Sequence, residues 1–287
     1  IKVTFGIIVG NRDVFSDELA KSGRIEIIEV LEELGCNYVI LDEIDTRFGV
    51  VETLSDAKKC ADLFKANKDK ILGIIVVLPN FGDEKSIANS IKMANLNVPI
   101  LIQASSDDIN RMGRKFRRDA FCGKISVCNN LYQHAIPFTL TKSHTCPINS
   151  KDFKNDIIKF EAICRIVHKI KNARLGQIGT RPAAFNTVRY SEKILEKNGI
   201  SIEPIDLSEI LAAINNLSND DINVKETVEY IKNYTETKEL PDEGVIKLAK
   251  LTVVIKNWVN ENDLDGFAFQ CWPSIQDNFG IVPCAVL

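Results

Sequence analysis

The chain has 287 residues, of which 45% are hydrophobic and 26% charged, so it can bury a substantial core and we expect two domains. Its formal net charge of -3 disfavours nucleic acids and other polyanions as partners. No run of about 18 apolar residues predicts a membrane span, and the eight scattered cysteines form no CxxC pair, which is typical of a cytoplasmic protein without disulfides or a structural zinc.

Short β-rich runs alternate with segments of helical period through the first half of the chain. The predicted strands are 3–9, 38–41, 71–78, 98–103 and 136–140, and the predicted helices between them lie near 25–34, 56–65, 84–94 and 119–133. This order favours a parallel sheet with helices on both faces. Five strands in this rhythm fit a flavodoxin-like, doubly wound α/β domain.

The pattern breaks between Thr141 and Lys151, and a long amphipathic helix follows. We therefore predict an N-terminal α/β domain at 1–149 and a second doubly wound, Rossmann-like domain at 150–287, with 150–172 as a linking helix. The second domain has predicted strands at 175–179, 201–205 and 266–270, separated by predicted helices at 183–198, 207–215, 221–234 and 243–262. Because the chain starts without Met and stops in the apolar run 281–287, we expect the second sheet to be truncated and the chain to be a piece of a longer protein.

Ligands of parallel α/β sheets bind beyond the carboxyl ends of the strands, so the residues just after each strand are the first candidates for a site. Four such segments, 10–13, 79–82, 179–190 and 270–273, combine planar hydrogen-bonding groups or an aromatic ring with glycine or proline. Amides and guanidinium groups bind hydroxyls, and a ring face covers the C–H side of a sugar. The candidate sugar-binding residues are Arg12, Asn80, Phe81, Arg181, Asn186, Gln270 and Trp272.

The segment that begins at Gly179 is predicted to be a tight turn followed by a helix start. Thr180 is a suitable N-cap and Pro182 suits the first helical turn, so free amides there would favour a polar or anionic ligand. An ordinary strand-to-helix connection is the alternative.

Each candidate residue also has a structural alternative. Arg12 could pair with Asp13 or Asp17, and Phe81 could anchor its loop. Arg181 and Asn186 could brace their helix, and Trp272 could pack at a hinge. A dinucleotide site at 176–179 is poorly supported, because two glycines without the full spaced set occur often by chance.

The chain resembles the L-fucose and L-arabinose isomerase superfamily, specifically its fucose-isomerase-like branch, over essentially its entire length. The clearest likeness lies in IGTRPAAFNTVRYSEKILEKNGISIEPIDLSE at 178–209, with support from GNRD at 10–13, RRDAFCG at 117–123 and DGFAFQCWPSIQDNFGIVPCAVL at 265–287. The resemblance implies two N-terminal α/β domains followed by a C-terminal catalytic domain, assembled into trimers or hexamers with active sites between subunits. It also implies aldose-ketose isomerisation through an ene-diol, generally with Mn²⁺ held by carboxylates and a histidine.

In that family the metal-binding carboxylates follow a segment like the one that ends at Leu287, so we expect no metal ligand and no catalytic residue in this chain. We interpret the chain as the N-terminal portion of a metal-dependent sugar isomerase that contributes substrate recognition and oligomer contacts and is inactive alone. Arg12 and the Asn80-Phe81 turn would reach a neighbouring subunit's site, whereas Gln270 and Trp272 would lie near the chain's own site. The alternative is a stand-alone sugar-binding or regulatory module that uses the cleft between the two domains.

Overall fold

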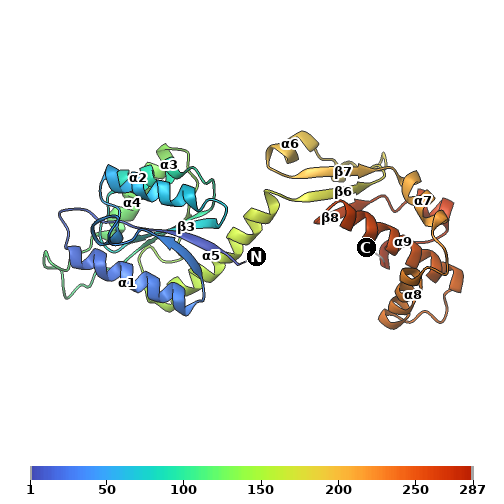
Figure 1. Cartoon of the computed structure of the whole chain (residues 1–287), viewed down its shortest axis with the longest axis horizontal. Helices are drawn as coiled ribbons and strands as arrows, with labels where there is room; N and C mark the ends of the chain where they lie inside the picture. Colours follow the sequence, from blue (N-terminus) through green and yellow to red (C-terminus); the bar gives the residue numbers. More distant parts are fainter. Residues whose placement is uncertain (1, 286–287) are drawn as a thin grey trace. The chain divides into compact units, whose positions relative to one another are not determined.

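The structure is a computed structural model that describes residues 2–285 and divides into two compact units, residues 1–168 and 169–287 (Figure 1). Each unit contains its own parallel sheet with helices packed on it. The α/β class with two parallel-sheet domains is therefore confirmed. Within the described residues, no helix is both long and apolar enough to cross a membrane.

The first unit is built on a five-stranded sheet whose order is β2-β1-β3-β4-β5, with every neighbouring pair parallel. Its strands are β1 (Thr4–Val9), β2 (Asn37–Ile40), β3 (Ile71–Leu78), β4 (Ile100–Ala104) and β5 (Thr139–Leu140). The five predicted strands are all present, although the fifth is shorter than predicted. The strand order reverses between β1 and β3, which makes the carboxyl ends of these two strands the topological switch point of the sheet.

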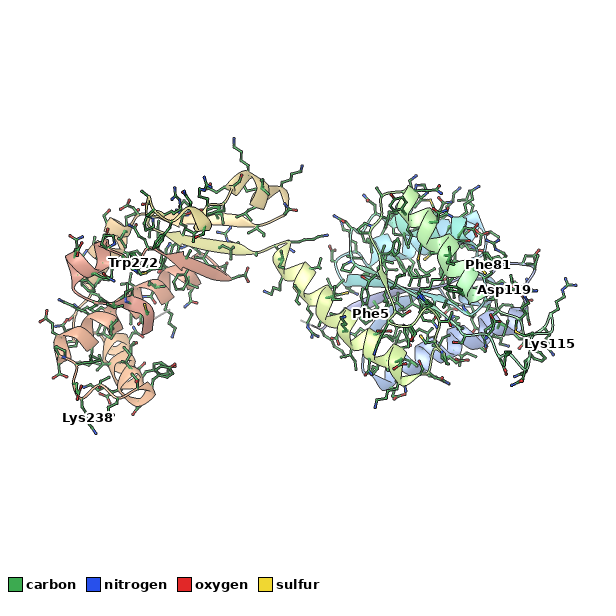
Figure 2. The ribbon with its side chains drawn as sticks, turned by 180° about the vertical axis from the view of Figure 1, so that it is seen from behind. Phe5, Phe81, Lys115, Asp119, Lys238 and Trp272 are labelled. Atoms are coloured by element: carbon green, nitrogen blue, oxygen red, sulfur yellow. The ribbon has the colours of Figure 1, made fainter. Side chains whose placement is uncertain are left out.

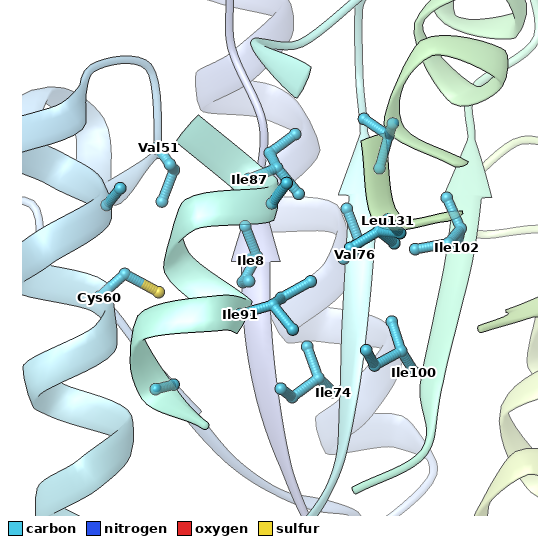
Figure 3. Packing of buried hydrophobic residues seen from close by; sticks show 14 of the residues in the cluster. Ile8, Val51, Cys60, Ile74, Val76, Ile87, Ile91, Ile100, Ile102 and Leu131 are labelled. Carbon is cyan, nitrogen blue, oxygen red and sulfur yellow. The ribbon is translucent and has the colours of Figure 1, made fainter. Parts of the chain in front are cut away.

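Helices cover both faces of the first sheet. One face carries α2 (Leu54–Ala66), α3 (Glu84–Ala94) and α4 (Ala120–Gln133), and the other carries α1 (Asp17–Glu33) and α5 (Lys151–Ile170), as Figure 1 shows. The short 3-10 turn η1 (Arg47–Gly49) follows β2. In Figure 3, apolar side chains of the three helices of the first group meet those of β1, β3 and β4. Because it is covered on both sides, β3 is buried over its whole length.

Helix α5 packs on the first sheet and is part of the first unit up to residue 168. Its side chains Phe153, Ile157, Phe160 and Cys164 are buried there, and the Phe160 ring centroid lies 5.7 Å from that of Phe5. A Cβ at Gly73 of β3 would lie 2.4 Å from the Cys164 Sγ, so glycine lets the helix approach the strand. The structure thus divides the chain at 168/169 instead of 149/150, because the buried stripe of this helix faces the first sheet.

The second unit has a three-stranded parallel sheet in the order β7-β6-β8, formed by β6 (Arg174–Ile178), β7 (Ser201–Ile205) and β8 (Gly266–Phe269). Its helices are α6 (Glu192–Lys197), α7 (Leu207–Asn216), α8 (Ile222–Tyr234), α9 (Asp242–Glu261) and α10 (Ser274–Phe279), with short 3-10 turns η2 (Asn186–Val188) and η3 (Pro283–Ala285). One core joins β6, α7, α9 and α10, and α8 packs on α9.

The opposite face of the second sheet is only thinly covered. Figure 1 shows α9 on one side of β6 and β8, while the short α6 lies beside β7. The predicted helix 183–198 is wrong over its first part, since the chain forms only the turn η2 before α6 begins after Ser191. Asn186, Thr187 and Val188 are weak helix formers, and nearly all side chains of 180–199 are exposed, so no packing compensates.

Candidate functional site

A glycine turn at the end of β6 brings the residues after β6 and β8 together. Gly179 has a φ of +74°, and a Cβ at this position would lie 2.4 Å from the Gln270 Oε1 atom. A side chain at this position would therefore be both strained and obstructed. The backbone N–H of Thr180 donates to the Gln270 Oε1 at 2.8 Å.

This hydrogen bond fixes the orientation of the Gln270 carboxamide. Because its oxygen accepts from Thr180, its Nε2 amino group, with two N–H donors, is left for other partners. That amino group has no hydrogen-bond partner within residues 2–285. Thr180 is not the helix N-cap that the sequence predicted, because the next α-helix along the chain, α6, has Ser191 at its N-cap position.

A pocket of about 560 Å³ lies at the carboxyl ends of β6 and β8. This volume is within the range of small-molecule sites. Three of the predicted residues, Arg181, Gln270 and Trp272, line it, whereas Asn186 does not. The remaining lining comes from Gln177, Ile178, Gly179, Thr180, Pro182, Phe185, Val188, Arg189, Tyr190, Ala268, Phe269 and Cys271.

The aromatic wall of the pocket is a pair of rings. Trp272 is 50% exposed, and its ring meets that of Phe185 edge to face at 5.0 Å between centroids. Figure 2 labels Trp272 in the second unit, just beyond β8. An indole held in this way presents an apolar surface beside the Gln270 amide, and a polyol has both a C–H side and hydroxyl groups to match.

Three further polar residues of the same pocket, Gln177, Arg189 and Tyr190, were not among the predicted site residues. The Gln177 Nε2 donates to the Gly179 carbonyl at 2.9 Å, and the Tyr190 hydroxyl donates to the Gln177 Oε1. Burial raises the pKa of Tyr190 above its ordinary value, with a smaller contribution from Glu192. A second pocket of about 300 Å³ adjoins the first, and Gln177 and Tyr190 line both pockets. The sequence signals were Gln177, a polar residue next to the apolar end of its strand, and the position of Arg189 and Tyr190 inside the candidate segment 179–190.

Arg12 and Phe81 form a braced pair on the first unit. The Arg12 Nε donates to the Gly82 carbonyl at 2.8 Å, and the guanidinium carbon lies 4.3 Å from the Phe81 ring centroid. Arg12 also forms an ion pair with Glu84. Glu84 thus takes the place of Asp13 and Asp17, the two partners considered from the sequence. Asp17 instead forms an ion pair with Arg47.

Asn80 lies in the interior at the switch point of the first sheet. It is fully buried, its Nδ2 donates to the Asn11 Oδ1 at 2.6 Å, and its Oδ1 accepts from the Gly82 N–H at 3.0 Å. This placement differs from the expectation of a direct sugar contact, because no surface of Asn80 is available to a ligand. Asn80 instead holds the turn that carries Phe81, which Figure 2 shows near the start of α4.

A second arginine and a close glycine contact support the same turn. The Arg118 Nη1 donates to the Pro79 carbonyl at 2.7 Å. Gly123 of α4 approaches so closely that a Cβ there would lie 1.8 Å from the Phe81 carbonyl oxygen. The two predicted groups of site residues thus lie in different units, and only the group in the second unit borders the pocket described above.

The described residues include no group of three or more His, Cys, Asp or Glu side chains that could hold a metal ion. The residues present therefore do not fit the manganese site that the family resemblance implies for the whole protein. We derive no chemical step through a metal for this chain.

Residues 6–171 match the sequence family described as fucose/sulfoquinovose isomerase, N-terminal domain. Two curated relatives, the sulfoquinovose isomerases of Priestia aryabhattai and of Priestia megaterium (strain ATCC 12872 / QMB1551), are each 22% identical to the chain over 277 residues. The alignments cover 96% of the chain and 58% of either relative, so the chain spans little more than half the length of these proteins.

Among solved structures, a glucose-galactose binding protein from Geobacillus stearothermophilus aligns with 98% of the chain and 83% of its own length, at 17% identity and a TM-score of 0.22.

Proposed function

The chain belongs to the fucose/sulfoquinovose isomerase N-terminal domain family, and from this premise we propose that it is the substrate-recognition part of an enzyme that interconverts an aldose and a ketose. The two sulfoquinovose isomerase relatives support a sugar as the substrate. In this proposal the chain binds and orients the sugar and contributes contacts between subunits, while the proton transfer occurs elsewhere in the whole protein.

The observation that carries the proposal is the pocket at the ends of β6 and β8. Its Gln270 amino group is oriented by Thr180, and its Trp272 ring lies beside it. The amide would donate to a sugar hydroxyl, and the ring would cover a C–H face. Such a pair fixes which face of the sugar is presented, which is what an isomerase needs before a proton moves between neighbouring carbons.

The same proposal assigns the divalent metal, expected to be Mn²⁺, to the part of the whole protein that the longer relatives have and this chain does not match. When bound, such a metal polarises a carbonyl and a hydroxyl of the sugar. The described residues of this chain contribute no candidate cluster for it.

Arg12 and Phe81 are proposed to act in trans, in a trimer or hexamer of the full-length protein. Both are partly exposed, and Asn80 bonds to Asn11 next to Arg12 and to Gly82 next to Phe81. Arg12→Ala should lower turnover in the assembled oligomer, and Arg165→Ala, which removes an exposed ion pair on α5, should not. Normal turnover of the Arg12→Ala oligomer would refute the trans role.

The first experiment measures manganese-dependent aldose-ketose conversion over a panel of pentoses, deoxyhexoses and sulfonated hexoses, for this chain and for the full-length product of its gene. We expect turnover only in the full-length product and sugar binding in both. Turnover by this chain alone would contradict the assignment of proton transfer to another part of the whole protein. A full-length product that neither binds nor converts any sugar would overturn the proposal.

A stand-alone sugar-binding module is the second candidate. It is favoured by one observation, namely that the whole described lining of the pocket comes from a single unit with its own core. Tight sugar binding by this chain, with no turnover by the full-length product under any metal, would support it.

A further inference from the structure

A loop of the first unit carries exposed positive charge. This basic loop, residues 109–117, lies between β4 and α4, and all of its residues are exposed. It contains four basic and no acidic residues. Three of the basic ones, Arg111, Arg114 and Lys115, form no ion pair within residues 2–285. Figure 2 shows Lys115 projecting away from the first unit, so the charge of the loop is available to a partner.

The basic loop also exposes apolar side chains. Ile109 is 87% exposed and Met112 is 46% exposed. The guanidinium carbon of Arg111 lies 3.9 Å from the centroid of the Phe116 ring, which is itself partly exposed. Exposed apolar groups gathered among arginines are typical of a protein–protein interface, whose core is enriched in Met, Phe and Arg.

A helix of the second unit presents a surface of the opposite sign. Its helix α8 packs on α9 through its apolar side, as Figure 1 shows. Residues at spacings of i, i+4, i+7, i+8 and i+12 share one side of a helix. The acidic face of α8 is formed in this way by five exposed residues, namely Ile222, Glu226, Glu229, Tyr230 and Tyr234.

The acidic face combines unpaired carboxylates with aromatic rings. Glu226 and Glu229 form no ion pair among the residues that the structure describes. Tyr230 and Tyr234 are 68% and 74% exposed, and their rings stack with 6.3 Å between centroids and 11° between planes. Guanidinium groups bind carboxylates and stack on aromatic faces, so this surface has both groups that arginines of a partner would bind.

The position of the basic loop provides a second argument for a partner. The loop follows β4 at the carboxyl edge of the first sheet, and the next residue, Arg118, donates to the Pro79 carbonyl beside the turn that carries Phe81. Arg12 and Phe81 at this edge are the residues proposed to act in a neighbouring subunit. An edge that reaches a neighbouring subunit brings the basic loop to that subunit as well.

We propose that the basic loop of one copy of the protein binds the acidic face of α8 in a second copy. Arg111, Arg114 and Lys115 supply the positive charge, and Glu226 and Glu229 supply the negative charge. Because two different surfaces meet, the contact is heterologous and closes into a ring where the rotation between copies allows it. The inference rests on the proposed function only for the expectation that subunits associate, and it adds which surfaces meet.

Sedimentation velocity of this chain over a wide range of protein concentration is the first test. Exposed charge pairs are individually weak and are screened by salt, so we expect a reversible association that is strongest at low ionic strength. Raising the ionic strength from about 0.01 to about 1 M shortens the Debye length from about 30 to about 3 Å and should weaken the association.

Charge reversal tests each surface separately. The loop variant combines Arg114→Glu with Lys115→Glu, and the helix variant combines Glu226→Lys with Glu229→Lys. Each should weaken self-association roughly tenfold or more, because like charges then face each other. The helix variant brings the net charge of the chain closer to zero. A general charge effect would therefore strengthen its association, opposite to the expected result.

Recovery of the contact controls for folding. An equimolar mixture of the two variants should associate again, because the reversed loop of one meets the reversed helix of the other. A chain that carries all four substitutions should also associate. The matched control combines Lys68→Glu with Lys70→Glu, two exposed lysines just before β3, at the opposite end of the first sheet, which form no ion pair within the described residues. It should associate as the unsubstituted chain does.

A chain that remains monomeric at every concentration and at low ionic strength would overturn the inference. An association that both variants leave intact, or that the mixture does not restore, would do the same. The proposed function fails differently. If the variants dissociate the subunits but the full-length product isomerises no sugar, the interface stands and the isomerase proposal falls. If the full-length product isomerises a sugar and neither variant changes association, the reverse holds.

Discussion

The carboxyl edges of the two sheets are equivalent positions in the fold, yet they differ in how their polar groups are satisfied. At the first edge, Asn11 and Asn80 are fully buried and bond to each other, and the nearby Arg12 pairs with Glu84. At the second edge, Gly179 leaves space for a pocket of about 560 Å³ whose two arginines have no carboxylate partner among the described residues. The carboxyl end of a parallel strand therefore indicates where a site can form. The side chains that follow the strand determine whether that place is packed with protein groups or remains open as a pocket.

The covering of the two sheets differs in the same way. Helices on both faces bury the first sheet, and its strand β3 has no exposed residue. The second sheet packs α7 and α9 on one face and leaves the segment 180–199 exposed on the other. The sheet of the first unit is thus buried on both faces, whereas residues around the pocket of the second unit are exposed to solvent.

The largest expected effect comes from removing the α5 contact that completes the burial of the first sheet. Phe160→Ala deletes a fully buried ring that stacks on Phe5. The free energy of unfolding of the first unit should therefore fall by about 3 to 5 kcal/mol. Urea unfolding followed by circular dichroism measures this loss. Both tryptophans, Trp258 and Trp272, lie in the second unit, so their fluorescence should be unchanged.

The control on the same helix is Ile166→Ala, whose side chain is exposed and should change stability by no more than about 0.5 kcal/mol. Equal losses in both variants would show that α5 does not belong to the first core.

Asn80→Ala tests whether the first edge is structural. It leaves the Asn11 Oδ1 and the Gly82 N–H without their buried partner, so we expect a loss of about 1 to 3 kcal/mol in the free energy of unfolding. The matched variant in the second unit is Gln270→Ala, which leaves only an exposed Thr180 N–H and should cost about 0.5 kcal/mol or less. If the Asn80→Ala protein is as stable as the unsubstituted chain but binds sugar more weakly, Asn80 has a role in ligand binding and not a structural one.

Gln270→Ala should instead affect the ligand. In the full-length protein, loss of the oriented amide leaves a sugar hydroxyl unpaired, which weakens binding by roughly 1 to 3 kcal/mol. Calorimetric titration measures this, and steady-state kinetics should show the same loss in kcat/KM. Unchanged affinity and kinetics would remove Gln270 from the site.

A further difference between the units is expected in alkaline stability. Burial raises the pKa of Cys60 and of Cys164 from 9.0 to about 12, and both thiols lie in the first unit. Since the folded state resists ionisation, their contribution to stability is complete below pH 9 and is lost as the pH rises towards 12, by up to about 1.4 kcal/mol per pH unit for each thiol.

Unfolding measured at pH 8 and pH 10 should therefore show a loss in the first unit that shrinks when Cys60→Ala and Cys164→Ala are introduced. Tryptophan fluorescence of the second unit provides the internal reference. A loss that is unaffected by the two substitutions would assign the alkaline sensitivity to other groups.

Several parts of the structure could be predicted because they depend on local patterns. The five strands of the first sheet and the three of the second follow from apolar β-rich runs between helical periods. The Gly179 turn follows from glycine's access to positive φ. The pocket position beyond β6 and β8 follows from the parallel order of the strands, and three of the four residues predicted there do line it.

Other parts could not be predicted because they depend on contacts between residues distant in sequence. The amphipathic stripe of 151–170 is visible in the sequence, but which sheet it covers depends on the close approach at Gly73. Asn80 follows a strand just as Gln270 does, and only its bonds to Asn11 and Gly82 place it in the interior. The irregular path of 180–190 arises because its weak helix formers at 186–188 are exposed, so little packing supports a helix there.

The α/β class, the presence of two domains and the isomerase family could be predicted from the sequence, since periodicity and motif residues are local properties of the chain. The tertiary structure alone decided that α5 joins the first unit, that Asn80 is buried and that Arg181 and Arg189 lack an acidic partner within residues 2–285. Burial and charge compensation are properties of neighbours in space, and a single sequence does not record which residues become neighbours.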